Sequence, residues 1–518
     1  MYLAYDKKNG VEYAKACTGR RVDGEVKITQ VSIGRVIDKE KNIFHNRKRG
    51  FFTYDVTTNT YGEIDTSTMP QIRRKNNKEK ALITFGDAWF LDWFIKEIKL
   101  YDSIGELKYG NTDSIRAMVL FYVLSNMANC YAEEWYESSY ARVLYPNANL
   151  SSQRVSDLLE AIGDESSYRA FFHRYFCDVV NKTRDGEDIL IDSTGLPNNI
   201  HFPLTAISNH NGKISNEVRL IYVVQRESNL PLYFRYIPGN VIDVSTLSRT
   251  IKELKAYNID TKFAILDAGY LTEANTKELY DNNISFISRL PEKTNLYKRI
   301  VSELSPKLEN ENTLVEFNGR YVYLVKTRVL LNGPDSRVLT DDEEVDPKEG
   351  NIAYAYLGRD ITMQEIESSR VFDNAKAYGY TTQDLHRIRM QKGLFVIYSS
   401  RPIKVAEILS KYYTRQQIEQ VFDICKNNTK MLPLRTQTEE TFRGHLILAF
   451  IASVIVKILQ ERLKNSKITP AGAFFSLGNQ DCKLFDDRVI TAEFTKNSND
   501  VLKLFKLKCP VEIKVPLC

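Results

Sequence analysis

The chain has 518 residues, which is too long for one ordinary hydrophobic core and predicts two or three domains. Hydrophobic residues make up 43% and charged residues 26% of the chain, a globular composition that excludes the disordered and collagen-like classes. The formal net charge of +5 is too small to indicate a partner by itself, so the distribution of charge is more informative.

The first 185 residues divide into a β-rich and a helical part. Short alternating runs predict strands over residues 1–80, and helical periodicity follows over residues 81–185, where Asp87, Asp113 and Ser151 are candidate helix starts. We expect an N-terminal β-rich module followed by a helical bundle. Two basic clusters in the β-rich part can neutralise phosphate groups, although a solvated loop explains most such runs: Arg47, Lys48, Arg49, and Arg73, Arg74, Lys75.

Residues 186–290 change to a mixed pattern of three strands, helix, strand, helix and strand, which is typical of an α/β fold. Residues 291–400 are rich in β-type runs and interrupt this pattern, with a polar stretch at 333–350 that we expect to be an exposed loop. Helical periodicity returns over residues 401–470, and residues 471–518 are interpreted as a C-terminal tail.

Two further features concern the environment of the protein. The seven cysteines are scattered without a CxxC or Cys/His spacing, which favours a reducing compartment and argues against a zinc site. No secretory signal is recognised at the N-terminus, and the longest apolar run, Leu446–Val456, is too short to span a bilayer. We therefore expect a cytoplasmic protein without a membrane partner, and a buried core helix at that run.

Two aspartates close apolar strands of the α/β region. Asp192 follows Ile189–Ile191, and Asp267 follows Phe263–Leu266 and precedes Ala268 and Gly269. A strand holds such a carboxylate rigidly, and a small-residue turn leaves it open to a crevice at the carboxyl end of the sheet. Either aspartate could instead simply form a turn or cap a helix. Together they are candidate metal ligands.

A third group lies in the helical stretch after residue 400. Tyr412, Arg415, Glu419 and Lys426 are offset by 3, 7 and 14 residues, which on one continuous helix places them within about 60° of one another. The carboxylate can bind a hard cation, and the guanidinium and phenol can bind phosphate oxygens. The alternative is a solvent-facing stripe in which Arg415 and Glu419 form an ion pair four residues apart.

In this order, strand Asp192, strand Asp267 and helix Glu419 resemble the acidic triad of DDE transposases. The spacing of Tyr412, Arg415, Glu419 and Lys426 is also similar to the Tyr-(2)-Arg-(3)-Glu-(6)-Lys signature of one group of bacterial insertion-sequence transposases. In that group a β-rich insertion splits an RNase H-like core between the second aspartate and the glutamate. Here 151 residues separate Asp267 from Glu419, and the β-rich residues 291–400 lie between them.

The resemblance implies an RNase H-like mixed sheet that cleaves and transfers DNA strands at the ends of an insertion sequence. Asp192, Asp267 and Glu419 would hold two Mg²⁺ or Mn²⁺ ions, while Tyr412, Arg415 and Lys426 would contact DNA phosphates. The expected partners are double-stranded DNA, as inverted-repeat ends and target, and a second copy of the chain, in a nucleoid-associated complex. An RNase H-like nuclease without strand transfer and a domesticated DNA-binding relative are the alternatives.

Overall fold

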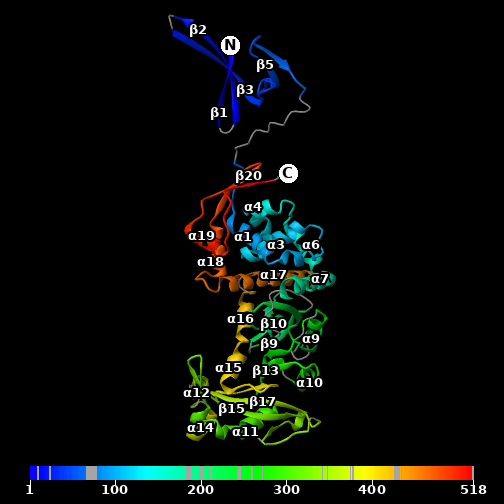
Figure 1. Ribbon diagram of the computed structural model, residues 1–518. Helices are drawn as coiled ribbons and strands as arrows, with labels where there is room; N and C mark the ends of the chain where they lie inside the picture. Colours follow the sequence, from blue (N-terminus) through cyan, green and yellow to red (C-terminus); the bar gives the residue numbers. More distant parts are fainter. Residues whose placement is uncertain are drawn as a thin grey trace. The chain divides into compact units, whose positions relative to one another are not determined.

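The computed structural model describes residues 1–515 except 9–10, 23–24, 66–78, 182–187, 199–203, 211–212, 242–246, 258, 260, 271, 341, 347, 374, 376–378, 425–431 and 433 (Figure 1). The chain forms two compact units, Met1–Asn77 and Lys78–Cys518. Each unit has a hydrophobic cluster of its own. The two units are therefore described separately.

Unit 1 is a six-stranded antiparallel sheet in which each strand pairs with the next along the chain. Its strands are β1 (Tyr2–Lys8), β2 (Val11–Val22), β3 (Glu25–Asp38), β4 (Ile43–Asn46), β5 (Gly50–Asp55) and β6 (Thr60–Glu63). Its small core contains Ala14, Ala16, Ile33, Phe44, Phe52 and Tyr54. The alternating runs of residues 1–80 thus form strands, with burial concentrated near the base of the long hairpin β2–β3.

Unit 2 begins with strand β7 (Ala81–Thr84) and a group of helices. These are α1 (Gly86–Glu97), α2 (Leu100–Ile104), α3 (Thr112–Leu124), α4 (Ala132–Ser138), α5 (Ala141–Leu144), α6 (Ser152–Ile162) and α7 (Glu165–Tyr175). Two of the expected caps are wrong, because Phe85 is the N-cap of α1 and Asn111 that of α3. Asp87 and Asp113 lie in the first turns instead, where the helix dipole favours a carboxylate. Ser151 is the N-cap of α6, as expected.

The middle of unit 2 is a mixed sheet with helices, in the order that the sequence pattern predicts apart from the extra strand β9. Its elements are β8 (Asp188–Pro197), β9 (Ala206–His210), β10 (Lys213–Gln225), β11 (Pro231–Pro238), α9 (Leu247–Ala256), β12 (Phe263–Leu266), α10 (Glu273–Asp281) and β13 (Ser285–Arg289). Strands β11, β10 and β8 are antiparallel neighbours, while β8, β12 and β13 run parallel. This parallel part places the end of β12 beside the middle of β8, at Ile191.

Residues 291–400 extend the same sheet and also contribute helices. The elements are α11 (Asn295–Leu304), β14 (Leu314–Phe317), β15 (Arg320–Leu331), β16 (Arg337–Leu339), β17 (Asn351–Asp360), α12 (Ile361–Asp373), α14 (Thr382–Met390) and β18 (Leu394–Ser399). Strand β18 pairs with β13 on one side and with β17 on the other, so one eleven-stranded sheet runs from β11 to β14. The stretch 333–350, expected to be a loop, contains the short strand β16.

Helices α15 (Val405–Tyr413), α16 (Gln416–Asp423) and α17 (Glu439–Leu463) follow the sheet. Helix α17 contacts α3, α6 and β11, and Figure 1 shows it between the helices of residues 86–175 and the sheet. By length and composition it could cross a membrane, but 89% of its most apolar window is buried inside the protein. The helix is longer than the apolar run Leu446–Val456, and its burial fits the expected core helix.

Residues 471–518, interpreted from sequence as a tail, form ordered structure around the start of unit 2. They contribute most of α18 (Pro470–Gly478), then β19 (Asp481–Leu484), β20 (Arg488–Thr491), α19 (Lys496–Leu504) and β21 (Glu512–Lys514). Strands β21, β20 and β19 form a four-stranded sheet with β7. The two ends of unit 2 are therefore joined by backbone hydrogen bonds.

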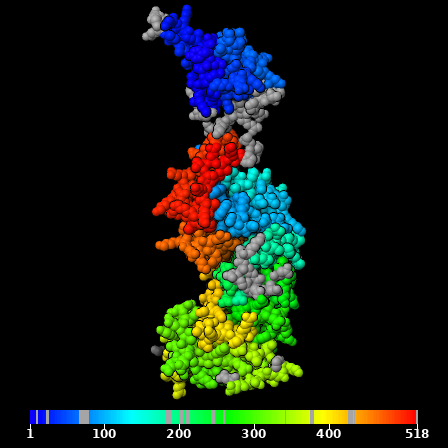
Figure 2. Space-filling view, in the orientation of Figure 1, coloured from blue at the N-terminus to red at the C-terminus, as the bar shows by residue number. Residues whose placement is uncertain are grey.

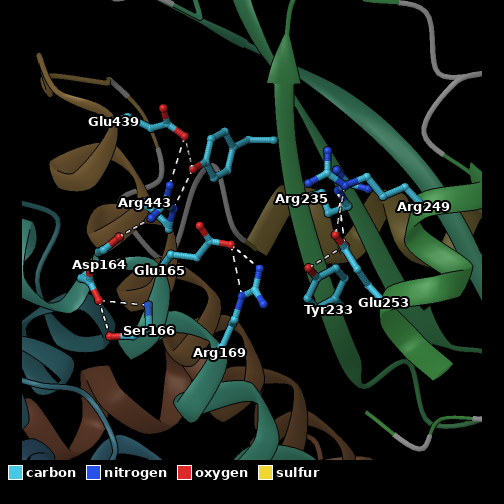
Figure 3. A network of polar contacts seen from close by, with 12 residues as sticks. Asp164, Glu165, Ser166, Arg169, Tyr233, Arg235, Arg249, Glu253, Glu439 and Arg443 are labelled. Atoms are coloured by element: carbon cyan, nitrogen blue, oxygen red, sulfur yellow. Dashed lines mark hydrogen bonds and ion pairs between the residues drawn. The ribbon is translucent and has the colours of Figure 1, made fainter. Parts of the chain in front are cut away.

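Helix α17 is attached to its neighbours by close packing and by a polar network (Figure 3). A Cβ added to Gly444 would lie 2.0 Å from the carbonyl oxygen of Leu159, so α17 and α6 touch backbone to backbone. The guanidinium of Arg443 donates to the carbonyl of Gly163 at 2.7 Å and to the hydroxyl of Tyr236 at 2.7 Å. These contacts connect α17 to the end of α6 and to strand β11.

Candidate active site

Asp192 and Asp267 occupy equivalent positions on two neighbouring strands. Strand β12 pairs in parallel with β8, and Leu266 lies opposite Ile191. The residue after each of these is an aspartate, so the register places Asp192 and Asp267 side by side. The apolar residues before them are buried and fix both strands in the core. The side chain of Asp192 is 9% exposed and that of Asp267 is 43% exposed, so this pair of carboxylates is open to solvent on the side of Asp267.

Arg415 lies against both carboxylates. Its Nη1 is 2.7 Å from Oδ2 of Asp192 and 3.5 Å from Oδ1 of Asp267. These two oxygens are therefore separated by no more than about 6 Å, the sum of the two distances. One positively charged group thus reaches two carboxylates that are 75 residues apart in the chain. A metal ion that binds both aspartates would lie close to the same two carboxylates as the guanidinium of Arg415. Carboxylate oxygens are the ligands that Mg²⁺ and Mn²⁺ prefer.

The charges around Asp192 do not balance. Burial raises the pKa of Asp192 above its ordinary value; Arg415 opposes this effect, and the negative charges of Asp267 and Glu419 add to it. Burial lowers the pKa of Arg415, but the carboxylates of Asp192 and Asp267 outweigh burial and raise it. Three acidic groups thus share one guanidinium, and the excess negative charge favours a divalent cation in this place.

The helix that carries the Tyr-Arg-Glu pattern is interrupted, which corrects the expectation of one continuous helix. Helix α15 ends at Tyr413 and α16 begins at Gln416. Between them the backbone tightens to hydrogen bonds three residues apart, from the N–H of Arg415 to Tyr412 and from that of Ile418 to Arg415. Arg415 is the N-cap residue of α16 and points toward the strands rather than along a solvent-facing stripe.

Tyr412 and Glu419 lie on either side of this interruption. Tyr412 is 4% exposed, its ring centroid is 5.9 Å from Cζ of Arg415, and burial raises the pKa of its hydroxyl to about 12. Glu419 is exposed on α16, whose buried residues Ile418 and Val421 face the core, and α16 packs on β8. Among the described residues Arg415 forms its ion pairs with the aspartates, so the alternative pair with Glu419 is not formed.

In the described part of the chain, no three His, Cys, Asp or Glu side chains stand close enough to hold a metal ion. Glu419 contributes its charge to the surroundings of Asp192 without joining the two aspartates at ligand distance. The donor set itself fits a hard cation, since two carboxylates already converge on one positive charge. The contact between Arg415 and the aspartates is the feature that sequence reasoning missed, because a helical pattern does not show what lies opposite it.

The basic residues of unit 1 are placed in part. Arg47, Lys48 and Arg49 form the exposed turn between β4 and β5, where the side chain of Asn46 accepts hydrogen bonds from the N–H groups of Lys48 and Arg49. The guanidinium of Arg49 lies 4.0 Å from the centroid of the Tyr61 ring. Four further candidates, Arg73, Arg74, Lys75 and Lys426, lie outside the described residues.

Comparison with known proteins gives one family. A family model described as a transposase DDE domain matches residues 183–455, which is more than half of the chain and includes Asp192, Asp267 and Glu419. No curated protein matches the chain. Among solved structures, the cryo-EM structure of the piggyBac transposase synaptic complex with hairpin DNA is similar, with 12% sequence identity, a TM-score of 0.39 and 75% of each chain covered. The chain belongs to the transposase DDE domain family and is a DNA-cleaving and strand-transferring enzyme of DNA transposition.

Proposed function

We propose that this transposase cuts the ends of its own insertion sequence and joins them to target DNA at a site built from Asp192, Asp267 and Glu419. Dependence on divalent metal follows from the family; two Mg²⁺ or Mn²⁺ ions are our proposal. The observation that carries it is the approach of Arg415 to both aspartates at 2.7 and 3.5 Å. Two strands thus present carboxylates to a common point, as a shared cation requires.

The proposed core is RNase H-like and split by residues 291–400. Support comes from the mixed sheet, in which the antiparallel strands β11, β10 and β8 continue into the parallel strands β12 and β13. The two aspartates come from β8 and from the end of β12, and Glu419 comes from a helix that packs on β8. The membership in the group with the Tyr-Arg-Glu-Lys signature rests on the spacing of those residues.

Each acidic residue has a proposed task. Asp192, which is buried, would serve as a ligand of both ions, while Asp267 and Glu419 would each hold one of them. When bound, the ions activate a water or a 3′-hydroxyl and stabilise the leaving oxygen. The raised pKa of Asp192 means that its carboxylate gains most from a neighbouring positive charge. The exposed Glu419 completes the site from the adjacent helix.

Arg415, Tyr412 and Lys426 are the proposed contacts to DNA phosphates. Arg415 already carries a planar set of donors close to the aspartates, and a guanidinium binds phosphate oxygens in pairs. Once another cation lies between the carboxylates, Arg415 is free to turn to phosphate. Tyr412 is only 4% exposed, so its contact requires DNA to reach the buried side chain beside Arg415.

The remaining parts of the proposal concern the complex. Unit 1 would contact the inverted-repeat ends through Arg47, Lys48 and Arg49, which are exposed, and through Arg73, Arg74 and Lys75. Two copies of the chain would pair the two ends of the element. The complex would assemble on cytoplasmic, nucleoid-associated DNA. The contact of unit 1 with the DNA ends is supported by its exposed cations, because Lys and Arg side chains neutralise the phosphates of a duplex.

The decisive experiment incubates the full chain with a duplex carrying the element's terminal DNA, a target plasmid and Mg²⁺. Products are resolved on a denaturing gel. Cleaved ends together with ends joined to the plasmid support the proposal. Cleaved ends without joined products favour an RNase H-like nuclease, and end binding without cleavage favours a domesticated DNA-binding relative. A reaction without Mg²⁺ is the matched control and should give neither product.

A further inference from the structure

The net positive charge of the chain lies in unit 1. Residues 1–77 contain 15 Lys and Arg against nine Asp and Glu, a formal charge of +6, whereas the whole chain carries +5. Residues 78–518 therefore carry −1. Since DNA binding is dominated by cations that neutralise phosphates, unit 1 is the part of the chain in which to look for the main contact with the duplex.

Within unit 1, the hairpin β2–β3 extends beyond the rest of the sheet. Strand β1 pairs with β2 only as far as Cys17, and β4 pairs with β3 only at Arg35 and beyond. Between these limits β2 and β3 pair only with each other, up to Val22 opposite Glu25. Figures 1 and 2 show this hairpin projecting past the other strands of the unit. We call residues 18–22 and 25–32 the ribbon.

The ribbon has no core of its own. Residues 18–21 and 26–32 are all exposed, on both faces, including the apolar Val26 at 61% and Ile28 at 51%. Each of its strands lacks a neighbour on its outer side. An isolated two-stranded hairpin is marginally stable in water, so this ribbon is not explained by packing within unit 1.

The cations of the ribbon form no ion pairs with acidic side chains among the described residues. Arg20 lies directly opposite Lys27, and like charges in that position destabilise an antiparallel pair. No ion pair or hydrogen bond joins the side chains of Arg20, Arg21 or Lys27 to another described residue. A partner with negative charge would remove this repulsion. A second copy of the same ribbon would increase it.

The shape of the ribbon fits one anionic partner in particular. The major groove of B-DNA, about 12 Å wide and about 8.5 Å deep, admits a two-stranded β-ribbon. The five residues from Thr18 to Val22 extend about 15 Å past the last pairing with β1, which is longer than the groove is deep. By sequence the continuous stretch 18–32 also contains Asp23 and Glu25, so its formal charge is only +1. Its recognition thus depends on where the cations stand.

From these observations we infer that the ribbon of β2 and β3 is an arm that enters the major groove of the DNA at the element end. Arg20 and Lys27 share one face and would contact phosphates or the acceptor edges of guanine. Val26 and Ile28 alternate with Lys27 along β3, so they lie on the opposite face and would point away from these base edges. This inference rests on the proposed function, and it adds to end binding a second surface, distinct from the acidic site and from the turn of Arg47, Lys48 and Arg49.

The test compares two double variants of the full chain. Arg20→Ala/Lys27→Ala removes the opposed cations of the ribbon, and Lys7→Ala/Lys41→Ala removes two exposed cations elsewhere in unit 1 as the matched control. The ribbon variant should bind a duplex carrying the terminal repeat about 10-fold or more weakly, and its affinity should depend less steeply on salt, by about two in the logarithmic slope. The control should stay within about 2-fold of the wild type.

A second measurement reports the groove directly. The wild-type protein should protect guanine N7, which lies in the major groove, from methylation by dimethyl sulfate, and the ribbon variant should lose this protection. Equal binding and protection by wild type and ribbon variant would overturn the inference. So would a change of oligomeric state on sedimentation without a change in DNA binding. If the wild type binds and protects the end but does not cleave it, the proposed function fails while the ribbon inference stands.

Discussion

At the scale of single residues, the molecule brings Asp192, Asp267 and Arg415 together, and Glu419 lies on the neighbouring helix α16. Asp192, Asp267 and Glu419 differ in exposure, from 9% for the side chain of Asp192 to the open surface of α16 for Glu419. In the proposed site all three residues should nevertheless be needed for cleavage, because the proposed metal pair loses a ligand when any one of them loses its charge. Arg415, which contacts Asp192 and Asp267, adds the proposed binding of DNA phosphate beside the metal ligands.

Asp192→Asn, Asp267→Asn and Glu419→Gln should each reduce cleavage by about 100-fold or more, because each keeps the shape of the side chain and removes the anionic ligand. End binding should stay unchanged on gel shift. Asp188→Asn is the matched control: it lies on the same strand and pairs with Arg226 at 2.8 Å, away from the site. Near wild-type cleavage by any of the three variants would show that its residue is not a ligand.

Arg415→Ala should separate DNA contact from metal binding. Removing the guanidinium frees Asp192 and Asp267, so Mn²⁺ measured by calorimetry should bind at least as tightly as to the wild type. Binding of the terminal duplex should weaken, since a phosphate contact is lost. Arg462→Ala, at an exposed arginine of α17, is the control. Unchanged DNA binding would mean that Arg415 serves only as an ion-pair partner of the aspartates.

At the scale of secondary-structure elements, the contact between α6 and α17 depends on a missing side chain. A Cβ on Gly444 would lie 2.0 Å from the carbonyl oxygen of Leu159, which belongs to a helix backbone and cannot yield cheaply. Gly444→Ala should therefore lower the free energy of unfolding by about 1–3 kcal/mol in urea titrations. Gly110→Ala, where nothing lies within 4 Å, should change it by less than about 0.5 kcal/mol. Equal stability of the two variants would contradict the backbone contact.

Helix α1 carries a pH-dependent contribution at Asp87. Burial raises the pKa of this carboxyl to about 6, while the N–H of Ala88 opposes the shift and Asp481 adds to it. The unfolded chain has a pKa near 3.9, so the folded state holds the proton more tightly. The resulting stability is present below about pH 4 and is lost as pH rises through about 6.

The stability of the wild type relative to Asp87→Asn should therefore fall by about 1–3 kcal/mol between pH 4 and pH 7.5. Urea unfolding of both proteins at the two pH values measures it, and other titrating groups cancel in the difference. A difference that rises with pH would show that Asp87 is stabilised as the carboxylate.

The sequence predicts most of the strands and helices of the α/β region, but it does not predict long-range strand pairing or the helix interruption at Arg415. Strands β8, β10, β11, β12 and β13 and helices α9 and α10 follow from local patterns, and Asp267 follows the end of β12 as expected. The expectation that Asp192 closes its strand was wrong, because β8 continues past it to Pro197 in its pairing with β10. The pairing of β18 with β13 could not be predicted, because it joins segments more than 100 residues apart. The interruption at Arg415 was also missed, since Tyr412 to Asp423 keeps helical periodicity while the backbone tightens for one turn.

At the scale of the whole molecule, charge and chemistry are divided between the two units. The excess positive charge lies in residues 1–77, and the acidic site lies in residues 78–518. The proposals above therefore assign DNA-end binding to unit 1 and cleavage to unit 2. In the proposed complex, two copies of the chain would pair the two ends of the element. The complex would then contain two acidic sites and two copies of the positively charged unit 1.

A chain of residues 78–518 should therefore keep its fold and its metal site but lose most of its affinity for the terminal duplex. Its core is independent of that of unit 1, so its thermal unfolding should remain cooperative. Gel shifts at several salt concentrations should give a much smaller logarithmic slope than the full chain. End binding with an undiminished slope would assign the phosphate contacts to unit 2.

The eleven-stranded sheet limits how this enzyme can move. Residues 291–400 interrupt the core in sequence, yet β18 is hydrogen-bonded to β13 on one side and to β17 on the other. A swing of that region as a hinged lid would have to break a ladder of backbone hydrogen bonds, at the cost of several unpaired groups. Force applied at β14 or β15 is instead transmitted as twist through β18 and β13 to the strands beside Asp267 and Asp192. DNA that binds at this end of the sheet would therefore adjust the acidic site by twisting the continuous sheet, not by moving a hinged domain.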